Sequence, residues 1–137
     1  MTWEPRPVPD VTPETRRFWR AAAEGRLLLN DCPDCGLTYF HPRALCPDCF
    51  AEAEWIESDG TGEIYTYSVV HQISGWPEEH VPVIVAYVEL DEGPRLLTNV
   101  VGAEPADVGI GDRVRVTFVE TENPDVAVPV FEPVSSA

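Results

Sequence analysis

The fold is decided by Cys32-Pro-Asp-Cys35 and, ten residues later, Cys46-Pro-Asp-Cys49, which together hold all the cysteines of the chain. A two-residue spacer lets one tight turn aim both sulfurs at the same point, and two such turns can complete a tetrahedral shell. The pattern therefore predicts a zinc ribbon in which Cys32, Cys35, Cys46 and Cys49 bind one Zn²⁺ ion. Because four thiolates leave no open coordination position, we expect the metal to be structural rather than catalytic.

Other chemistries of the same residues are less favoured. A pair of disulfides would need an oxidising compartment, whereas the N-terminus lacks the basic and then apolar run of a secretory signal, so we expect a cytoplasmic protein. A thioredoxin-like redox site needs one motif at the start of a helix after a strand, and two symmetric copies do not fit that. His41 could replace one ligand, but four thiolates are already present.

Charge narrows the range of functions. The chain has 24 acidic residues against nine basic ones, all of them arginines, and a net charge of −15 at pH 7. Such a surface repels phosphate backbones, so nucleic-acid binding is disfavoured although zinc ribbons permit it. No apolar run reaches the length of a membrane span of about eighteen residues or more, so no membrane association is expected.

Residues 1–25 are expected to form a proline-rich arm and a helix. Thr12 is the predicted N-cap, and the helix should end near Glu24, with Gly25 as the residue that follows its C-cap. The helix carries an apolar stripe that includes Phe18 and Trp19. Its remaining surface and the ribbon together present a basic patch in an acidic chain, made of Arg16, Arg17, Arg20 and Arg43. These arginines either pair with nearby glutamates or bind an anion.

Residues 26–57 should form the ribbon, with a strand over 26–30 and a hairpin of 37–41 and 43–45. Residues 58–137 should form a small barrel and a C-terminal tail, because β-branched and aromatic residues alternate with polar ones between glycine-rich turns. The predicted strands are 64–72, 83–90, 95–101, 113–120 and 126–131. We therefore expect a mainly β protein with an N-terminal helix, a rubredoxin-like zinc ribbon and an OB-fold barrel. A β-sandwich is the alternative.

The chain shows little catalytic machinery. Every cysteine is expected to bind metal, lysine is absent, and no serine lies in a nucleophile elbow. His71 is the one histidine expected near the barrel mouth, but it lacks an evident carboxylate partner. Trp76, in a long loop over 73–82, is either an exposed anchor for a partner or a plug on the barrel end.

Several motifs together resemble the acyl-CoA-associated zinc-ribbon and OB-fold family over residues 12–131. They are Phe18-Trp19, Cys32-x-x-Cys35-Gly36, Pro42-Arg43, Cys46-Pro47-x-Cys49, Gly60-x-Gly62, Leu90-x-Glu92-Gly93 and Gly111-Asp112-x-Val114. The chain departs from the family at His41, where many relatives carry a second proline before Pro42-Arg43.

The resemblance implies a non-catalytic scaffold subunit of an acyl-CoA enzyme, such as a thiolase, a hydroxymethylglutaryl-CoA synthase, a sterol side-chain aldolase or a MaoC-type hydratase. Such a subunit helps to bind or channel a CoA thioester. The phosphates of CoA are then expected at Arg43, Arg16, Arg17 and Arg20, because guanidinium groups match phosphate oxygens. The partner surface is expected at Phe18, Trp19 and Trp76. The alternatives are a free-standing acyl-CoA binding module and a single-stranded nucleic-acid-binding OB protein.

Overall fold

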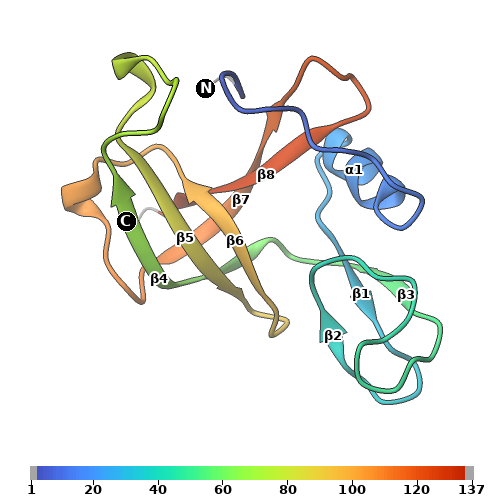
Figure 1. Ribbon diagram of the computed structural model, residues 1–137. Coiled ribbons are helices and arrows are strands. Elements are labelled where there is room, and N and C mark those ends of the chain that lie inside the picture. Colours follow the sequence, from blue (N-terminus) through green and yellow to red (C-terminus); the bar gives the residue numbers. More distant parts are fainter. Residues whose placement is uncertain (1–2, 135–137) are drawn as a thin grey trace.

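A computed structural model describes residues 3–134 of the chain. Within them lie one α-helix, a three-stranded sheet and a closed five-stranded barrel, so the predicted fold class is confirmed. Figure 1 shows the helix and the small sheet side by side at one flank of the barrel. No helix among the described residues is long and apolar enough to cross a membrane.

The helix α1 (Arg16–Ala23) begins later than predicted. The backbone N–H of Thr12 donates to Thr15 Oγ1 at 3.0 Å, and the N–H of Thr15 donates to Thr12 Oγ1 at 3.3 Å. This reciprocal pair stabilises a turn before the helix, so Thr12 caps that turn instead of the helix itself. The helix end agrees with the prediction. Gly25 has a φ of 81°, and the N–H of Arg26 donates to the carbonyl of Ala21, as in a Schellman motif.

The ribbon sheet has the order β2-β1-β3, with β1 (Leu28–Asp31) in the centre, β2 (Thr38–Tyr39) on one edge and β3 (Glu54–Glu57) on the other. The predicted strand over 43–45 is wrong. That segment makes only an isolated bridge between Leu45 and Glu52, because residues 44–53 wrap around the second cysteine pair.

The barrel closes in the order β4-β5-β6-β8-β7, which rules out the sandwich alternative because one continuous sheet returns on itself. Its strands are β4 (Thr61–Val70), β5 (Val83–Leu90), β6 (Arg95–Val100), β7 (Arg113–Glu120) and β8 (Ala127–Pro133). The pairing of β4 with both β5 and β7 brings backbones close together near Gly62. A side chain there would overlap the carbonyl group of Glu89, so glycine is required.

One hydrophobic core joins the three parts. Phe18 of α1 and Leu29 of β1 belong to the same buried cluster as Ile64, Val88 and Phe131 of the barrel. The helix contacts β1, β7 and β8, so it lies between the ribbon and the barrel. Because the ribbon shares this core, it cannot move away from the barrel without exposing apolar surface. The ribbon is thus held in a fixed position relative to the barrel.

Candidate functional site

The two cysteine pairs are held by turns with the same backbone hydrogen bonds. In the first, the N–H of Cys32 donates to the carbonyl of Leu37 at 2.8 Å, and the N–H of Gly36 donates to the carbonyl of Cys32 at 2.9 Å. In the second, Cys46 donates to Ala51 and Phe50 donates to Cys46 at the same distances, 2.8 and 2.9 Å. The equal spacing in the sequence therefore produces two equivalent turns.

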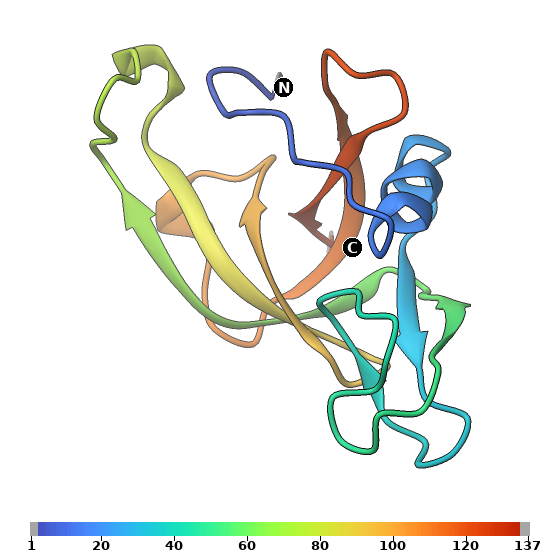
Figure 2. The ribbon, with the colours of Figure 1, turned by 45° about the vertical axis from the view of Figure 1, so that its right-hand side comes forward.

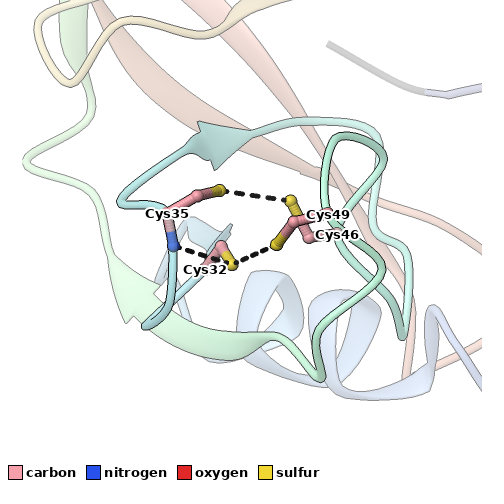
Figure 3. A group of neighbouring side chains, drawn as sticks. All are labelled: Cys32, Cys35, Cys46 and Cys49. Carbon is pink, nitrogen blue, oxygen red and sulfur yellow. Dashed lines mark hydrogen bonds between the residues drawn. The ribbon is translucent and has the colours of Figure 1, made fainter.

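These turns face each other and bring the four sulfurs together, as Figure 3 shows. The Sγ atoms of Cys32, Cys35, Cys46 and Cys49 all lie within 4.8 Å of one another. The separation is 3.4 Å between the sulfurs of Cys32 and Cys49 and 3.6 Å between those of Cys35 and Cys46. Four sulfurs at about 2.3 Å from a tetrahedral metal ion are about 3.8 Å apart, whereas a disulfide requires about 2.05 Å. The geometry fits a metal site and does not fit disulfides.

The surroundings act differently on the sulfurs. The pKa values of the Cys35 and Cys49 thiols are lowered by a backbone hydrogen bond but raised overall by hydrogen bonding to Cys32 and by desolvation, whereas the pKa of the Cys32 thiol is lowered. The backbone N–H of Cys35 points at Cys32 Sγ at 3.5 Å, and this hydrogen bond is the largest cause that lowers the pKa of the Cys32 thiol to about 7. Cys32 and Cys46 are buried, whereas Cys35 and Cys49 are exposed. His41 is exposed and does not belong to this group of ligands. The four cysteines could thus hold one metal ion, and four sulfur ligands would leave that ion no free position.

A cleft of about 450 Å³ lies between the start of α1 and the ribbon. Arg17 and Arg43 line it, together with Glu14, Glu52 and Trp55, whereas Arg16 and Arg20 do not. The structure therefore brings together two of the four predicted arginines. Arg16 and Arg20 are exposed elsewhere on α1.

The backbone of Arg43 is fixed by the ribbon. Its N–H donates to Asn30 Oδ1 at 3.0 Å, and its carbonyl accepts the hydroxyl of Tyr39 at 2.7 Å. The next N–H, that of Ala44, donates to Glu14 Oε2 at 2.7 Å, which ties this loop to the segment before α1. The side chain of Arg43 is thus displayed from a rigid support.

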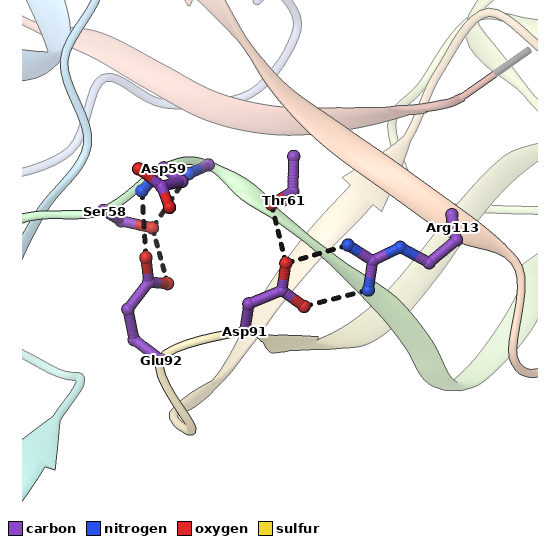
Figure 4. Close-up of polar contacts among 7 residues, drawn as sticks. Ser58, Asp59, Thr61, Asp91, Glu92 and Arg113 are labelled. Carbon is purple, nitrogen blue, oxygen red and sulfur yellow. Dashed lines mark hydrogen bonds and ion pairs between the residues drawn. The ribbon is translucent and has the colours of Figure 1, made fainter.

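The barrel arginines differ, because each pairs with a carboxylate. Arg113 binds Asp91 at 2.8 Å, Arg95 binds Glu89 at 2.9 Å, and Arg115 binds Glu132 at 2.9 Å. Figure 4 shows the two parallel contacts between Arg113 and Asp91, which lower the pKa of Asp91 to about 2.

Within residues 3–134, the three arginines of α1 and Arg43 in the ribbon form no such ion pair. The three helix residues are Arg16, Arg17 and Arg20. The alternative that they serve to neutralise neighbouring glutamates is therefore not what the structure shows. Free guanidinium groups in a chain of charge −15 are available to an anion.

The expected partner surface is only partly accessible. Phe18 is 2% exposed and packs against Trp19 and Phe40, so its ring is not available to a partner, contrary to the expectation from the sequence. This difference arises because α1 covers the barrel with its apolar stripe. Trp19 is half-buried, and its indole N–H is enclosed without a hydrogen-bond acceptor among residues 3–134.

Trp76 contacts the N-terminal arm. Figure 2 shows the arm crossing the end of the barrel between the loop over 71–82 and the turn from β7 to β8. The guanidinium of Arg6 lies 4.9 Å from the ring centre of Trp3 and 5.0 Å from that of Trp76, and it donates to Asn99 Oδ1 at 3.1 Å. Burial lowers the pKa of Arg6. Trp76 is therefore half-covered by its own chain.

His71 is exposed after the end of β4 and makes no ion pair or hydrogen bond with a carboxylate among the described residues.

Two features of the structure were not anticipated from the sequence. The first is the contact of Arg6 with Trp3 and Trp76. Because Arg6 and Trp76 are far apart in the sequence, no local sequence pattern indicates this contact. The positive φ of Phe50, 62°, could have been found by aligning the two cysteine motifs, because Phe50 occupies the position of Gly36.

Comparison with known proteins shows the same two-part architecture. Residues 19–54 match the model for the rubredoxin-like zinc ribbon domain of ChsH2, and residues 55–119 match that for the C-terminal OB-fold domain of ChsH2. A DUF35 domain-containing scaffold protein of Methanocaldococcus jannaschii is 39% identical over 105 residues, which cover 74% of each chain.

A probable enoyl-CoA hydratase alpha subunit of Thermomonospora curvata is 36% identical over 130 residues. The match covers 93% of this chain but only 40% of that protein, so the chain spans about two fifths of its relative. Among solved structures, the one described as Ltp2-ChsH2(DUF35) aldolase matches with a TM-score of 0.80 and 35% identity, over 91% of this chain and 98% of that one. The chain therefore belongs to the DUF35 family of zinc-ribbon and OB-fold proteins that includes ChsH2.

Proposed function

We propose that this chain is a non-catalytic subunit that binds an acyl-CoA enzyme and holds the anionic end of its CoA thioester in the cleft between α1 and the ribbon. The names of its relatives support the class of partner, since they include a hydratase alpha subunit, an aldolase complex and scaffold proteins. The proposed partner is a thiolase-superfamily enzyme, a hydroxymethylglutaryl-CoA synthase or a sterol side-chain aldolase.

The metal in this proposal is zinc, and its role is structural. Four thiolates in a tetrahedral arrangement are typical of structural zinc, and the ribbon has little apolar core of its own besides Cys32, Tyr39 and Cys46. The ion would hold the two turns together and so keep Arg43 in place. It would supply no reactive water, because the shell is complete.

The single observation that carries the CoA assignment is the distribution of paired and unpaired arginines. In a chain of charge −15, the arginines of the barrel strands have carboxylate partners, and those at the cleft have none among the described residues. The phosphates of CoA need cationic donors, and a guanidinium presents two parallel N–H groups to them. Glu14 and Glu52 also line the cleft, and they would restrict the anion to the side of Arg17 and Arg43.

We retain Trp76 as a candidate for a second contact with the partner. Its ring lines an open cleft of about 720 Å³ together with His71 and Glu78, although Arg6 lies over it. Aromatic side chains of this kind are frequent among the residues that dominate binding energy. We therefore expect Trp76→Ala to weaken assembly by about 2 kcal/mol or more without unfolding the chain.

The proposal is tested by isolating the full chain with its partner from the native host and identifying the protein that remains bound in stoichiometric amount. We expect an acyl-CoA enzyme, and calorimetric titration of the purified components should then reproduce the complex. A stoichiometric partner that does not act on CoA thioesters, or a chain that stays alone at micromolar concentration, would contradict the proposal.

A further inference from the structure

The two cysteine turns are equivalent in their hydrogen bonds but differ in the residue that follows the second cysteine. Gly36 occupies this position in the first turn with a φ of 76°, and Phe50 occupies it in the second with a φ of 62°. This left-handed backbone conformation is easy for glycine and unfavourable for a bulky L residue. The second turn thus carries strain that a glycine would avoid.

Among residues 3–134, the ring of Phe50 belongs to neither hydrophobic cluster. The side chain is 73% exposed, the highest value among the exposed large hydrophobic residues of the described part. The small cluster around the cysteines is built from other side chains and does not include Phe50. The hydrogen bond of the turn is made by the Phe50 backbone, just as it is by Gly36. Backbone strain at a residue that packs against neither cluster points to a role in a contact outside the chain.

The surroundings of Phe50 define the chemistry of that contact. Asp48 and Glu52 flank it on the same turn, both exposed and without an ion pair among residues 3–134. Leu45, which is 48% exposed, lies opposite Glu52 through the isolated bridge. The surface is thus an apolar projection with an acidic rim, and the complementary site is an apolar pocket with arginine or lysine side chains around it.

We propose that Phe50 anchors this chain in such a pocket on the acyl-CoA enzyme; this inference rests on the proposed function and names the contact that it requires. Leu45 and Glu52 also line the cleft of Arg17 and Arg43. A partner bound at Phe50 therefore lies beside the cleft assigned to CoA, so one subunit can hold the anionic end of the ligand while the other acts on the thioester.

Binding at Phe50 has a second consequence for the metal site. Cys49 precedes Phe50 and is exposed, so a partner that covers the ring also covers the accessible side of this ligand. Loss of the metal to a chelator should then be slower in the complex than in the free chain. This readout does not depend on catalytic activity.

The deciding variant is Phe50→Gly, made in the full chain and titrated against the enzyme isolated in the test above. Glycine relieves the strained turn, so the unfolding midpoint should stay the same or rise, while the dissociation constant increases at least about tenfold. Protection of the metal should be lost as well. Phe50→Tyr keeps the ring and should bind like the wild type.

Ile110→Ala is the matched control, because Ile110 is 70% exposed and lies in the connection before β7, on the barrel rather than the ribbon. The affinity of the Ile110→Ala variant for the acyl-CoA enzyme should equal that of the wild type. Unchanged affinity for Phe50→Gly, or equal losses for Phe50→Gly and Ile110→Ala, would overturn the inference while leaving the proposed function intact. A lowered unfolding midpoint for Phe50→Gly would also overturn it, since the ring would then be structural. If the wild type bound no acyl-CoA enzyme, both proposals would fail.

Discussion

Replacing Arg43 with glutamate should raise the Michaelis constant of the assembled enzyme for its CoA thioester by between about 60-fold and about 700-fold. The Arg43 side chain is exposed and has no ion pair within residues 3–134, so the change leaves no carboxylate of this chain unpaired. Its backbone hydrogen bonds to Asn30 and Tyr39 do not involve the side chain, so the ribbon should stay folded.

The magnitude follows from two contributions. A hydrogen bond between charged groups is worth about 1.5–3 kcal/mol, and it is lost with the guanidinium. The new carboxylate, placed about 4 Å from a phosphate oxygen in water, adds about 1 kcal/mol of repulsion. Together they give about 2.5–4 kcal/mol, and each factor of ten corresponds to about 1.4 kcal/mol.

The assay compares two substrates and two variants. Steady-state kinetics of the complex are measured with a CoA thioester and with a pantetheine thioester that lacks the phosphates of the nucleotide. Arg43→Glu should raise the Michaelis constant for the CoA thioester alone. Added salt should weaken binding of the CoA thioester more in the wild-type complex than in the variant complex. Arg115→Glu makes the same charge change on the barrel, and it should alter neither Michaelis constant by more than about threefold. Equal losses on both substrates would refute a phosphate-binding role for Arg43.

Three further outcomes are expected. The purified chain should contain one equivalent of zinc. Cys35→Ser should release the zinc and unfold the ribbon, because such sites supply roughly 10 kcal/mol or more of folding free energy. Metal analysis that finds no zinc in the wild type would contradict this prediction. Phe18→Ala should lower the free energy of unfolding, measured in urea, by about 3–5 kcal/mol, since the Phe18 ring is 2% exposed in the shared core. A loss below about 1 kcal/mol would show that α1 does not belong to this core. Arg113 lowers the pKa of Asp91 from 3.8 to about 2, so this pair stabilises the fold above pH 3.8 and stops doing so as the pH falls towards 2. Because both side chains are half-exposed, solvent screening should keep this contribution small, and Asp91→Asn should abolish it. An Asp91→Asn variant with the same acid dependence of stability as the wild type would count against the pair.

The metal site was predictable from the sequence because its geometry is local. Two residues between the cysteines of each pair fix the turn, and the equal motifs place the ligands symmetrically. The barrel strands were predictable for a similar reason, since alternation with a period of two marks half-buried strands such as β7. These features depend on neighbouring residues rather than on distant contacts.

The errors arose where distant contacts decide the structure. The edge strand β3 pairs directly with β1 although both cysteine turns lie between these strands in the sequence, whereas the predicted hairpin partner over 43–45 makes only an isolated bridge. The sequence predicts an exposed Phe18 because it does not show that α1 packs on the barrel, where Phe18 joins the shared core. The pairing state of the arginines is also a property of the fold, and it separates Arg43 from Arg113 although both are exposed.

The most direct test of the central claim is the turnover of an acyl-CoA thioester by the purified chain, alone and with its partner enzyme. Four sulfur ligands would leave a bound metal ion no open position, and His71 has no carboxylate partner among the described residues, so the chain alone should show no turnover above the buffer rate. Activity should appear only with the partner. Turnover by the isolated chain that is abolished in His71→Ala would contradict the account.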